Sequence, residues 1–251
     1  MLKEQFIVEV ALKRVDIPSF SHYPFCLNAV HNLTSLQLHP SVTFIVGENG
    51  SGKSTLLEAV AVALGFNPEG GSKNFNFGTF SSHSELHRYL RISRGVRTPK
   101  DGYFLRAESF FNVATEIHKL DEEPATAPPI INSYGGKSLH AQSHGESFLS
   151  LIYSRFGGNG IYILDEPEAA LSPTKQMALL TRIHDLVEQN SQFIIATHSP
   201  IIMSYPDSII YQIEEDGAAI TEYEKTEHYN TMRYFMNNYV KVLSILMNSE
   251  K

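Results

Sequence analysis

Residues 41–65 read SVTFIVGENGSGKSTLLEAVAVALG, and this stretch decides the fold. An uncharged, mostly apolar run ends in a glycine-rich turn, after which leucine, alanine and valine residues continue until Gly65. The pattern predicts a buried strand, a tight turn and a helix that a glycine closes. A β-loop-α unit of this kind is typical of an α/β domain with a mainly parallel sheet.

The turn itself, GENGSGKST, matches the pattern G-x-x-x-x-G-K-[ST]. Its glycines let the backbone wrap around phosphate groups, whose charge the N–H groups and the helix N-terminus stabilise. We expect Lys53 to neutralise the β- and γ-phosphates of a nucleotide, and the Ser54 hydroxyl to bind Mg²⁺. A glycine-rich turn that binds nothing is the alternative, but the strand before it and the helix after it favour a phosphate site. The predicted binding residues are Gly47, Glu48, Asn49, Gly50, Ser51, Gly52, Lys53, Ser54 and Thr55.

Other strands and helices alternate along the chain. Apolar runs at residues 161–165 and 192–196 predict two more buried strands, and residues 172–190 predict an amphipathic helix between them. Residues 5–15 favour a strand, 102–120 a strand that leads into a helix, 208–223 a hairpin, and the last 25 or so residues a helix. We therefore predict a single α/β domain over residues 1–251, with residues 66–140 as an antiparallel β side lobe and a helical insertion.

Composition restricts the function classes. The chain has 251 residues, 42% hydrophobic and 19% charged, as in soluble globular proteins. Its net charge of -7 limits any nucleic-acid surface to a local basic patch. The single cysteine, Cys26, cannot form an internal disulfide. The chain shows neither the apolar core of a signal peptide nor a run long enough to cross a bilayer, which predicts a cytoplasmic protein without direct membrane insertion.

Polar residues follow the two later buried strands. Asp165 ends one of them, where it is expected to hold the Mg²⁺ shell, and the next residue, Glu166, is placed to orient the water that attacks a γ-phosphate. His198 follows the other strand and could contact the γ-phosphate. The alternatives are a plain strand end at Asp165 and a structural histidine at His198.

Together, GENGSGKST, SHGE, ILDEPEAALS and ATHS resemble the ATP-binding-cassette (ABC) ATPase domain, over residues 40 to about 212. The sequences of the last two motifs are more similar to the soluble RecF/SMC-like and overcoming-lysogeny-like group, and to small predicted bacterial ATPases, than to transporter subunits. The resemblance implies a P-loop NTPase fold with an antiparallel β side lobe and a helical signature subdomain. It also implies ATP and Mg²⁺ as ligands, Glu166 as the catalytic base, His198 as a switch histidine, and an ATP-dependent homodimer.

The resemblance also assigns residues 143–146, SHGE, to the signature that contacts the γ-phosphate bound by the other protomer. Ser143, Gly145 and Glu146 are therefore predicted to bind nucleotide across a dimer. Ser143 and Glu146 have the spacing of a helix capping box, which is compatible with the same role. His144 departs from the glycine that the family has there.

Three further assignments are less direct. Glu108 falls where the family has a glutamine that touches Mg²⁺. Tyr23 or Phe25 could stack on adenine, although most aromatic residues in such a stretch belong to the core. A basic segment could bind nucleic acid, although a solvated edge is the simpler interpretation. Its basic residues are Arg88, Arg91, Arg94, Arg97 and Lys100.

Three functions remain open at this stage. The first is a soluble Mg²⁺-dependent ATPase that drives a partner protein or a nucleic-acid process, such as repair or phage defence. The second is the nucleotide-binding subunit of an ABC transporter. The third, an unrelated P-loop kinase or GTPase, lacks an N-K-x-D motif and leaves SHGE and ATHS unexplained.

Overall fold

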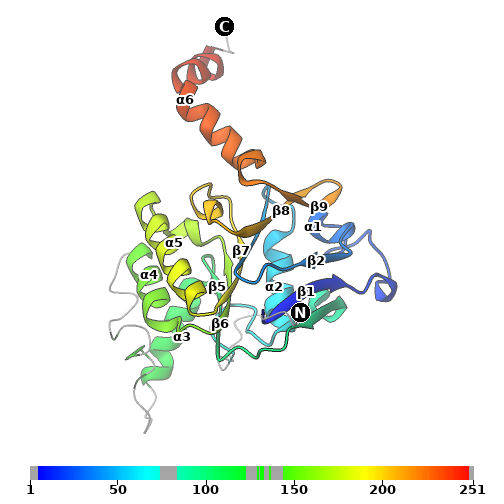
Figure 1. The fold of residues 1–251 in the computed structure, drawn as a ribbon, viewed down its shortest axis with the longest axis vertical. Coiled ribbons are helices and arrows are strands. Elements are labelled where there is room, and N and C mark those ends of the chain that lie inside the picture. Colours follow the sequence, from blue (N-terminus) through cyan, green and yellow to red (C-terminus); the bar gives the residue numbers. More distant parts are fainter. Residues whose placement is uncertain are drawn as a thin grey trace.

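A six-stranded sheet runs through the centre of the molecule (Figure 1). The computed structural model describes residues 5–73, 84–122, 129, 131–132, 136 and 144–248. The strands of this sheet, in spatial order, are β5 (Asp101–Arg106), β6 (Gly160–Asp165), β7 (Gln192–Ala196), β3 (Val42–Gly47), β8 (Ser208–Glu214) and β9 (Gly217–Thr221). The first five strands are parallel and only β9 is antiparallel to its neighbour. The predicted α/β fold with a mainly parallel sheet is confirmed.

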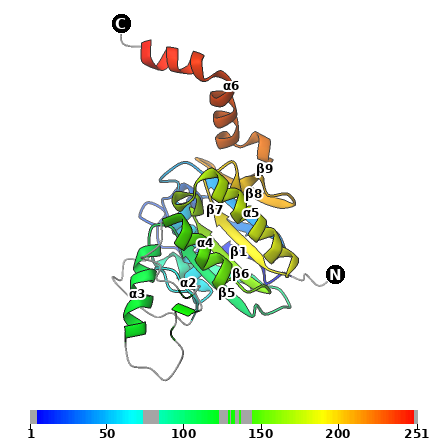
Figure 2. The ribbon, with the colours of Figure 1, turned by 90° about the vertical axis from the view of Figure 1, so that its left-hand side faces the viewer.

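Successive apolar side chains of the central sheet point to opposite faces, and both faces are buried. On β3, Phe44 and Val46 belong to one hydrophobic cluster and Ile45 to the other, as the two-residue period of a strand requires. The face of Phe44 packs against the helices α3 (Phe110–Glu122), α4 (His144–Arg155) and α5 (Pro173–Glu188). The face of Ile45 packs against α2 (Lys53–Ala63) and a second sheet. These layers are visible in Figures 1 and 2.

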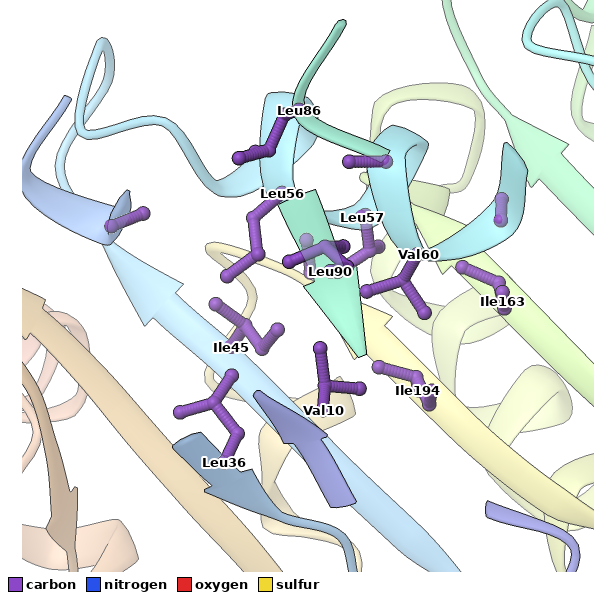
Figure 3. Packing of buried hydrophobic residues seen from close by; sticks show 14 of the residues in the cluster. Val10, Leu36, Ile45, Leu56, Leu57, Val60, Leu86, Leu90, Ile163 and Ile194 are labelled. Carbon is purple, nitrogen blue, oxygen red and sulfur yellow. The ribbon is translucent and has the colours of Figure 1, made fainter. Parts of the chain in front are cut away.

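The second sheet has three antiparallel strands. Their spatial order is β2 (Ser35–Gln37), β1 (Ile7–Leu12) and β4 (Leu90–Arg94). Figure 3 shows Val10, Leu36 and Leu90 of this sheet close to apolar side chains of α2 and of the central sheet. The helix α2 is thus fixed from two sides, and it carries the glycine-rich turn at its N-terminal end.

The described strands within residues 66–140 lie in two different sheets. Strand β4 belongs to the antiparallel sheet, whereas β5 pairs in parallel with β6 and extends the central sheet. The register places Leu105 opposite Leu164 and Arg106 opposite Asp165. Likewise, the hairpin of β8 and β9 extends the central sheet instead of joining a side lobe.

The C-terminal helix α6 (Glu227–Asn248) extends away from the rest of the molecule (Figures 1 and 2). It is interrupted at Asn238, whose backbone angles are not helical. Many of its apolar side chains are exposed, among them Met236 and Leu246. Within the described part of the chain, no helix combines the length and the hydropathy needed to cross a membrane. The remaining short helices are η1 (Arg14–Asp16), α1 (Asn28–His31), η2 (Glu85–Tyr89), η5 (Pro167–Ala170), η6 (Ile202–Ser204) and η7 (Tyr223–Lys225).

Candidate active site

The glycine-rich turn joins β3 to α2 in a conformation that needs glycine. Gly50 and Gly52 have φ angles of +81° and +95°, in the left-handed region that other residues rarely adopt. A Cβ atom at Gly52 would lie 2.8 Å from Cβ of Leu27, so a larger residue would clash there. A Cβ atom at Gly50 would meet no atom within 4 Å, which shows that this side of the turn is open.

Lys53, the first residue of α2, lies across the inside of the turn. Its ammonium group donates to the carbonyl oxygens of Gly47 and Glu48, both at 2.8 Å. Burial lowers the pKa of Lys53, and the nearby carboxylates of Glu166 and Asp165 oppose this shift. The two bonds use two of the three ammonium hydrogens and hold the charge beside the open side of the turn.

A hollow of about 410 Å³ lies over the turn. It is lined by Leu27, Asn49, Gly50, Gly52, Lys53, Ser54, Thr55 and Glu166. The first N–H groups of α2 have no acceptor within their own helix, and the helix dipole adds partial positive charge at this end. Together with Lys53, these donors suit a chain of phosphate groups, so the residues present fit a nucleotide.

Ser54 and Asp165 form a pair of oxygen donors beside this hollow. The Ser54 hydroxyl donates to Oδ1 of Asp165 at 2.9 Å. Two neighbouring oxygens of an octahedral Mg²⁺ shell, each roughly 2.1 Å from the metal, lie about 3 Å apart. Both the chemistry and the spacing of the pair therefore fit Mg²⁺. Burial raises the pKa of Asp165 to about 6, against the opposing charge of Arg106.

Arg106 is a site residue that the sequence did not indicate. It ends β5, opposite Asp165, and its Nε lies 3.5 Å from Oδ2 of Asp165. Its Nη1 contacts Glu58 at 2.8 Å, and its Nη2 lies 3.6 Å from Glu108. The Glu108 side chain is 87% exposed, and Arg106 is the charged group it meets. The structure thus does not bring Glu108 to the pair formed by Ser54 and Asp165, where we expected it as a metal ligand.

Glu166 and His198 meet where β6 and β7 end. The backbone of Glu166 is left-handed, with φ at +50°, and its N–H donates to the carbonyl of Ala196 at 3.0 Å. This conformation, which costs on the order of 1 kcal/mol in a residue with a side chain, turns the carboxylate toward the glycine-rich turn. His198 Nε2 lies 3.4 Å from Oε1 of Glu166. The strand order thus brings together both predicted catalytic residues.

Glu168 holds the loop that carries His198. Its carboxylate accepts hydrogen bonds from the backbone N–H of His198 and from the Thr197 hydroxyl, the latter at 2.8 Å. Burial raises the pKa of Glu168, while these hydrogen bonds oppose the shift. No sequence pattern indicated these contacts.

The predicted signature is only partly within the described residues. Ser143 lies outside them, and α4 begins at the next residue. Gly145 is buried, and a Cβ atom there would lie 2.7 Å from the carbonyl oxygen of Ala170 and 3.1 Å from Nζ of Lys175. Glu146 is exposed. The start of α4 therefore packs closely against the loop that follows Glu166.

The proposed adenine contacts need a correction. Phe25 is 3% exposed, and its ring packs edge-on against Tyr89 with 5.0 Å between centroids, so it belongs to the core and cannot stack on a base. Tyr23 is 61% exposed. Leu27, which no sequence pattern indicated, lines the hollow instead, and the N–H of Ala29 donates to the carbonyl of Ser51 at 2.8 Å.

The basic segment is divided between two environments. Arg97 is part of the fold, because its guanidinium donates to Asn159 at 2.9 Å and lies over the ring of Phe6. The others are exposed: Arg88, Arg91, Arg94 and Lys100. The residues therefore do not form one uninterrupted binding surface.

Comparison with known proteins identifies the fold. One family model, described as an AAA domain, matches residues 21–138, and another, described as an AAA ATPase domain, matches residues 147–203. The solved structure of cbiO1 from Clostridium perfringens, part of the ABC transporter complex cbiONQ, matches 97% of this chain and 99% of its own. The TM-score is 0.52 at 17% sequence identity. The chain has the fold of an ABC-type ATPase domain.

The chain is also similar in sequence to two curated transporter proteins. The energy-coupling factor transporter ATP-binding protein EcfA2 of Staphylococcus aureus is 24% identical over 229 residues, which cover 83% of this chain and 78% of that protein. ABC transporter G family member STR2 of Medicago truncatula is 24% identical over 187 residues, which are 69% of this chain. The match covers 26% of the plant protein, so the chain spans about a quarter of its length. The matches to ABC and AAA ATPases support ATP binding and hydrolysis as the general reaction.

Proposed function

We propose that this chain is a Mg²⁺-dependent ATPase that closes as an ATP-bound dimer and opens on hydrolysis, and so drives a partner. The observation that supports this most strongly is that Glu166 shares one hollow with Lys53 and Ser54. A protein that only binds a nucleotide does not need a carboxylate in that place, whereas hydrolysis needs a group that orients water and accepts its proton.

Each side chain then has a distinct role. The backbone of the glycine-rich turn and Lys53 bind the β- and γ-phosphates, and Ser54 with Asp165 would hold Mg²⁺, which supplies positive charge to the phosphate oxygens. Glu166 orients the attacking water and accepts its proton. His198, beside Glu166, donates to the γ-phosphate.

The second half of each site comes from another copy in this proposal. Residues 144–146 of the signature begin α4, and the partial positive charge at a helix N-terminus favours a phosphate there. In a dimer with two-fold symmetry, the signature of one copy would face the glycine-rich turn of the other, twice. Gly145 packs closely on the loop after Glu166, which supports a joint movement of the start of α4 and that loop.

For the driven process, we propose a partner protein whose state follows dimer closure, as in repair or phage defence. The second candidate is the ATP-binding subunit of a membrane transporter, which the similarity to transporter proteins favours. Capture with Glu166→Gln protein and ATP, which should arrest the closed dimer, distinguishes the two. A multi-span membrane protein in the captured material supports the transporter, and a soluble partner supports the first proposal.

The catalytic proposal is tested with the same substitution. Glu166→Gln should keep ATP affinity and lower turnover by roughly 10²–10⁴-fold, the range for a lost general base. Glu215→Gln is the matched control, because Glu215 is an exposed glutamate in the turn between β8 and β9 and should leave turnover unchanged. Full turnover in Glu166→Gln would exclude Glu166 from the mechanism.

A further inference from the structure

The switch histidine has a second histidine as its neighbour. His198 Nδ1 lies 2.9 Å from Nε2 of His228, and the two rings meet at 60° with 5.0 Å between their centroids. His228 lies in the first turn of α6, 30 residues further along the chain. Nothing in its sequence surroundings indicates a part in the phosphate site.

Hydrogen bonds hold the start of α6 next to the loop that carries His198. Thr226, just before α6, is fully buried; its hydroxyl donates to the carbonyl of Tyr223 at 2.7 Å and accepts from the N–H of Tyr229. The Tyr223 hydroxyl in turn donates to the carbonyl of Pro200 at 2.9 Å. Since Pro200 is two residues beyond His198, the base of α6 is attached directly to the loop that carries the switch histidine.

The distance between the two rings determines where hydrogens can lie. Two imidazole nitrogens 2.9 Å apart share one hydrogen, so one ring donates and the other accepts. The other nitrogen of His198, Nε2, lies 3.4 Å from the Glu166 carboxylate. A carboxylate attracts an N–H and repels a lone pair, which favours the hydrogen of His198 on Nε2. His198 Nδ1 must then accept, and His228 must donate from Nε2.

The charges around the pair are consistent with two neutral rings. Burial lowers the pKa of both histidines, and the positive charge of Lys53 adds to this effect. Glu166 opposes the shift at His198, and Glu227 and Glu48 oppose it at His228. In a neutral imidazole the choice of tautomer decides which nitrogen donates, and a γ-phosphate requires a donor.

We propose that His228 is a positioning residue, which holds His198 in the tautomer with its hydrogen on Nε2, facing Glu166 and the phosphate hollow. The proposal rests on the proposed function for its effect on turnover, but the tautomer itself does not depend on hydrolysis. Without the donor from α6, His198 Nδ1 can carry the hydrogen itself, and Nε2 then presents a lone pair where the γ-phosphate needs an N–H.

The tautomer is measured directly by ¹⁵N NMR of histidine-labelled protein near pH 7.5, with the His198 signals assigned by their loss in His198→Gln. We expect His198 to be neutral with its hydrogen on Nε2 in the wild-type protein, and to shift toward the Nδ1 form in His228→Leu. An Nδ1 hydrogen on His198 in the wild-type protein would overturn the proposal. That result needs no variant of His228, so the proposal can be overturned even if His228→Leu does not fold.

Turnover separates positioning from a structural role. His228→Leu should lower ATP turnover by roughly 10–100-fold with unchanged ATP affinity, as for other residues that orient a functional histidine. His228→Gln, which keeps an N–H donor at a similar reach, should retain most of the turnover and the Nε2 form. His184→Leu, an exposed histidine on α5, is the matched control. Unchanged turnover and tautomer in His228→Leu would refute the inference, whereas a wild-type protein without ATPase activity would refute only the proposed function.

Discussion

The hydroxyl of Ser54 lies 2.9 Å from the carboxylate of Asp165, although 111 residues separate the two along the chain. The contact exists because β7 lies between β3 and β6, so the ends of three parallel strands meet at one edge of the sheet. The start of α2 thus supplies one of the two oxygen donors, and the end of β6 supplies the other.

Replacement of the Asp165 carboxylate should weaken the binding of Mg²⁺. Asp165→Asn keeps the size of the side chain but removes its charge, so the Mg²⁺ concentration for half-maximal ATPase activity should rise by roughly 10–100-fold. The measurement is an ATPase titration with Mg²⁺ at saturating ATP. Asp216→Asn, at the exposed turn between β8 and β9, is the control. An unchanged midpoint in Asp165→Asn would remove the residue from the metal site.

The same residue should make stability depend on pH. Burial raises the pKa of Asp165 from its usual 3.8 to about 6, so between these values the folded protein holds a proton that the unfolded chain releases. The free energy of unfolding should therefore fall as the pH rises from about 4 to 6, by on the order of 3 kcal/mol from this group. Urea unfolding with EDTA present measures it. Asp165→Asn should flatten this part of the profile, and an equal slope in both proteins would contradict the assignment.

Loss of Lys53 should weaken nucleotide binding itself. Lys53→Ala removes the charge that neutralises the phosphates, so ATP affinity measured by calorimetry should fall by at least about tenfold, which corresponds to 1.4 kcal/mol. Lys175→Ala is a matched control for the affinity of a single chain, because Lys175 lies near Gly145 and is not among the residues that line the hollow over the glycine-rich turn. Wild-type affinity in Lys53→Ala would contradict the phosphate site.

A mixing experiment tests whether two copies share each site. Lys53→Ala and Ser143→Arg should each be nearly inactive alone. In a mixed dimer one site carries both defects and the other carries neither. Half of the dimers in a freely exchanging equal mixture are mixed, so about a quarter of wild-type sites should return. No recovery of ATPase activity, with exchange shown to have occurred, would refute the shared site.

The packing between the two sheets predicts a change in stability from a residue that does not line the candidate active site. Leu36 on β2 is 2% exposed and packs in the cluster of Figure 3. Leu36→Ala should lower the free energy of unfolding by roughly 2–5 kcal/mol, since it leaves a cavity. Ile220→Ala on β9, where the side chain is 67% exposed, should change it by less than about 0.5 kcal/mol. Denaturant unfolding of both variants checks the difference, and equal effects would contradict the packing.

Local patterns predicted the parts of this molecule whose neighbours are close in sequence. The unit from β3 through the turn to α2 was clear because apolar spacing, glycines and a helix end all lie within 25 residues. The helix α5 was clear for the same reason: the Ser172 hydroxyl accepts from the N–H of Lys175, and Pro173 occupies the first turn. Asp165, Glu166 and His198 were found because each ends an apolar strand.

Contacts between distant segments were not predictable in this way. Arg106 reaches Asp165 because β5 joins the central sheet next to β6. The sequence of residues 101–106 does not indicate to which sheet this strand belongs. Leu27 reaches the hollow through a close approach to Gly52. His228 reaches His198 because the buried hydroxyl of Thr226 fixes the start of α6. The core position of Phe25 could not be distinguished from adenine stacking, because an aromatic residue near the turn has the same local sequence whether it is buried or free.

The projection of α6 turns a small change at its base into a large one at its far end. From Glu227 to the break at Asn238 the helix is about 17 Å long, so a rotation of 10° around its base would move the break by about 3 Å. The histidine pair lies at the base and moves little in such a rotation, whereas a partner bound to the outer part of α6 would be displaced by the full distance. A small rotation at His228, beside His198, would therefore become a large movement at the outer end of α6.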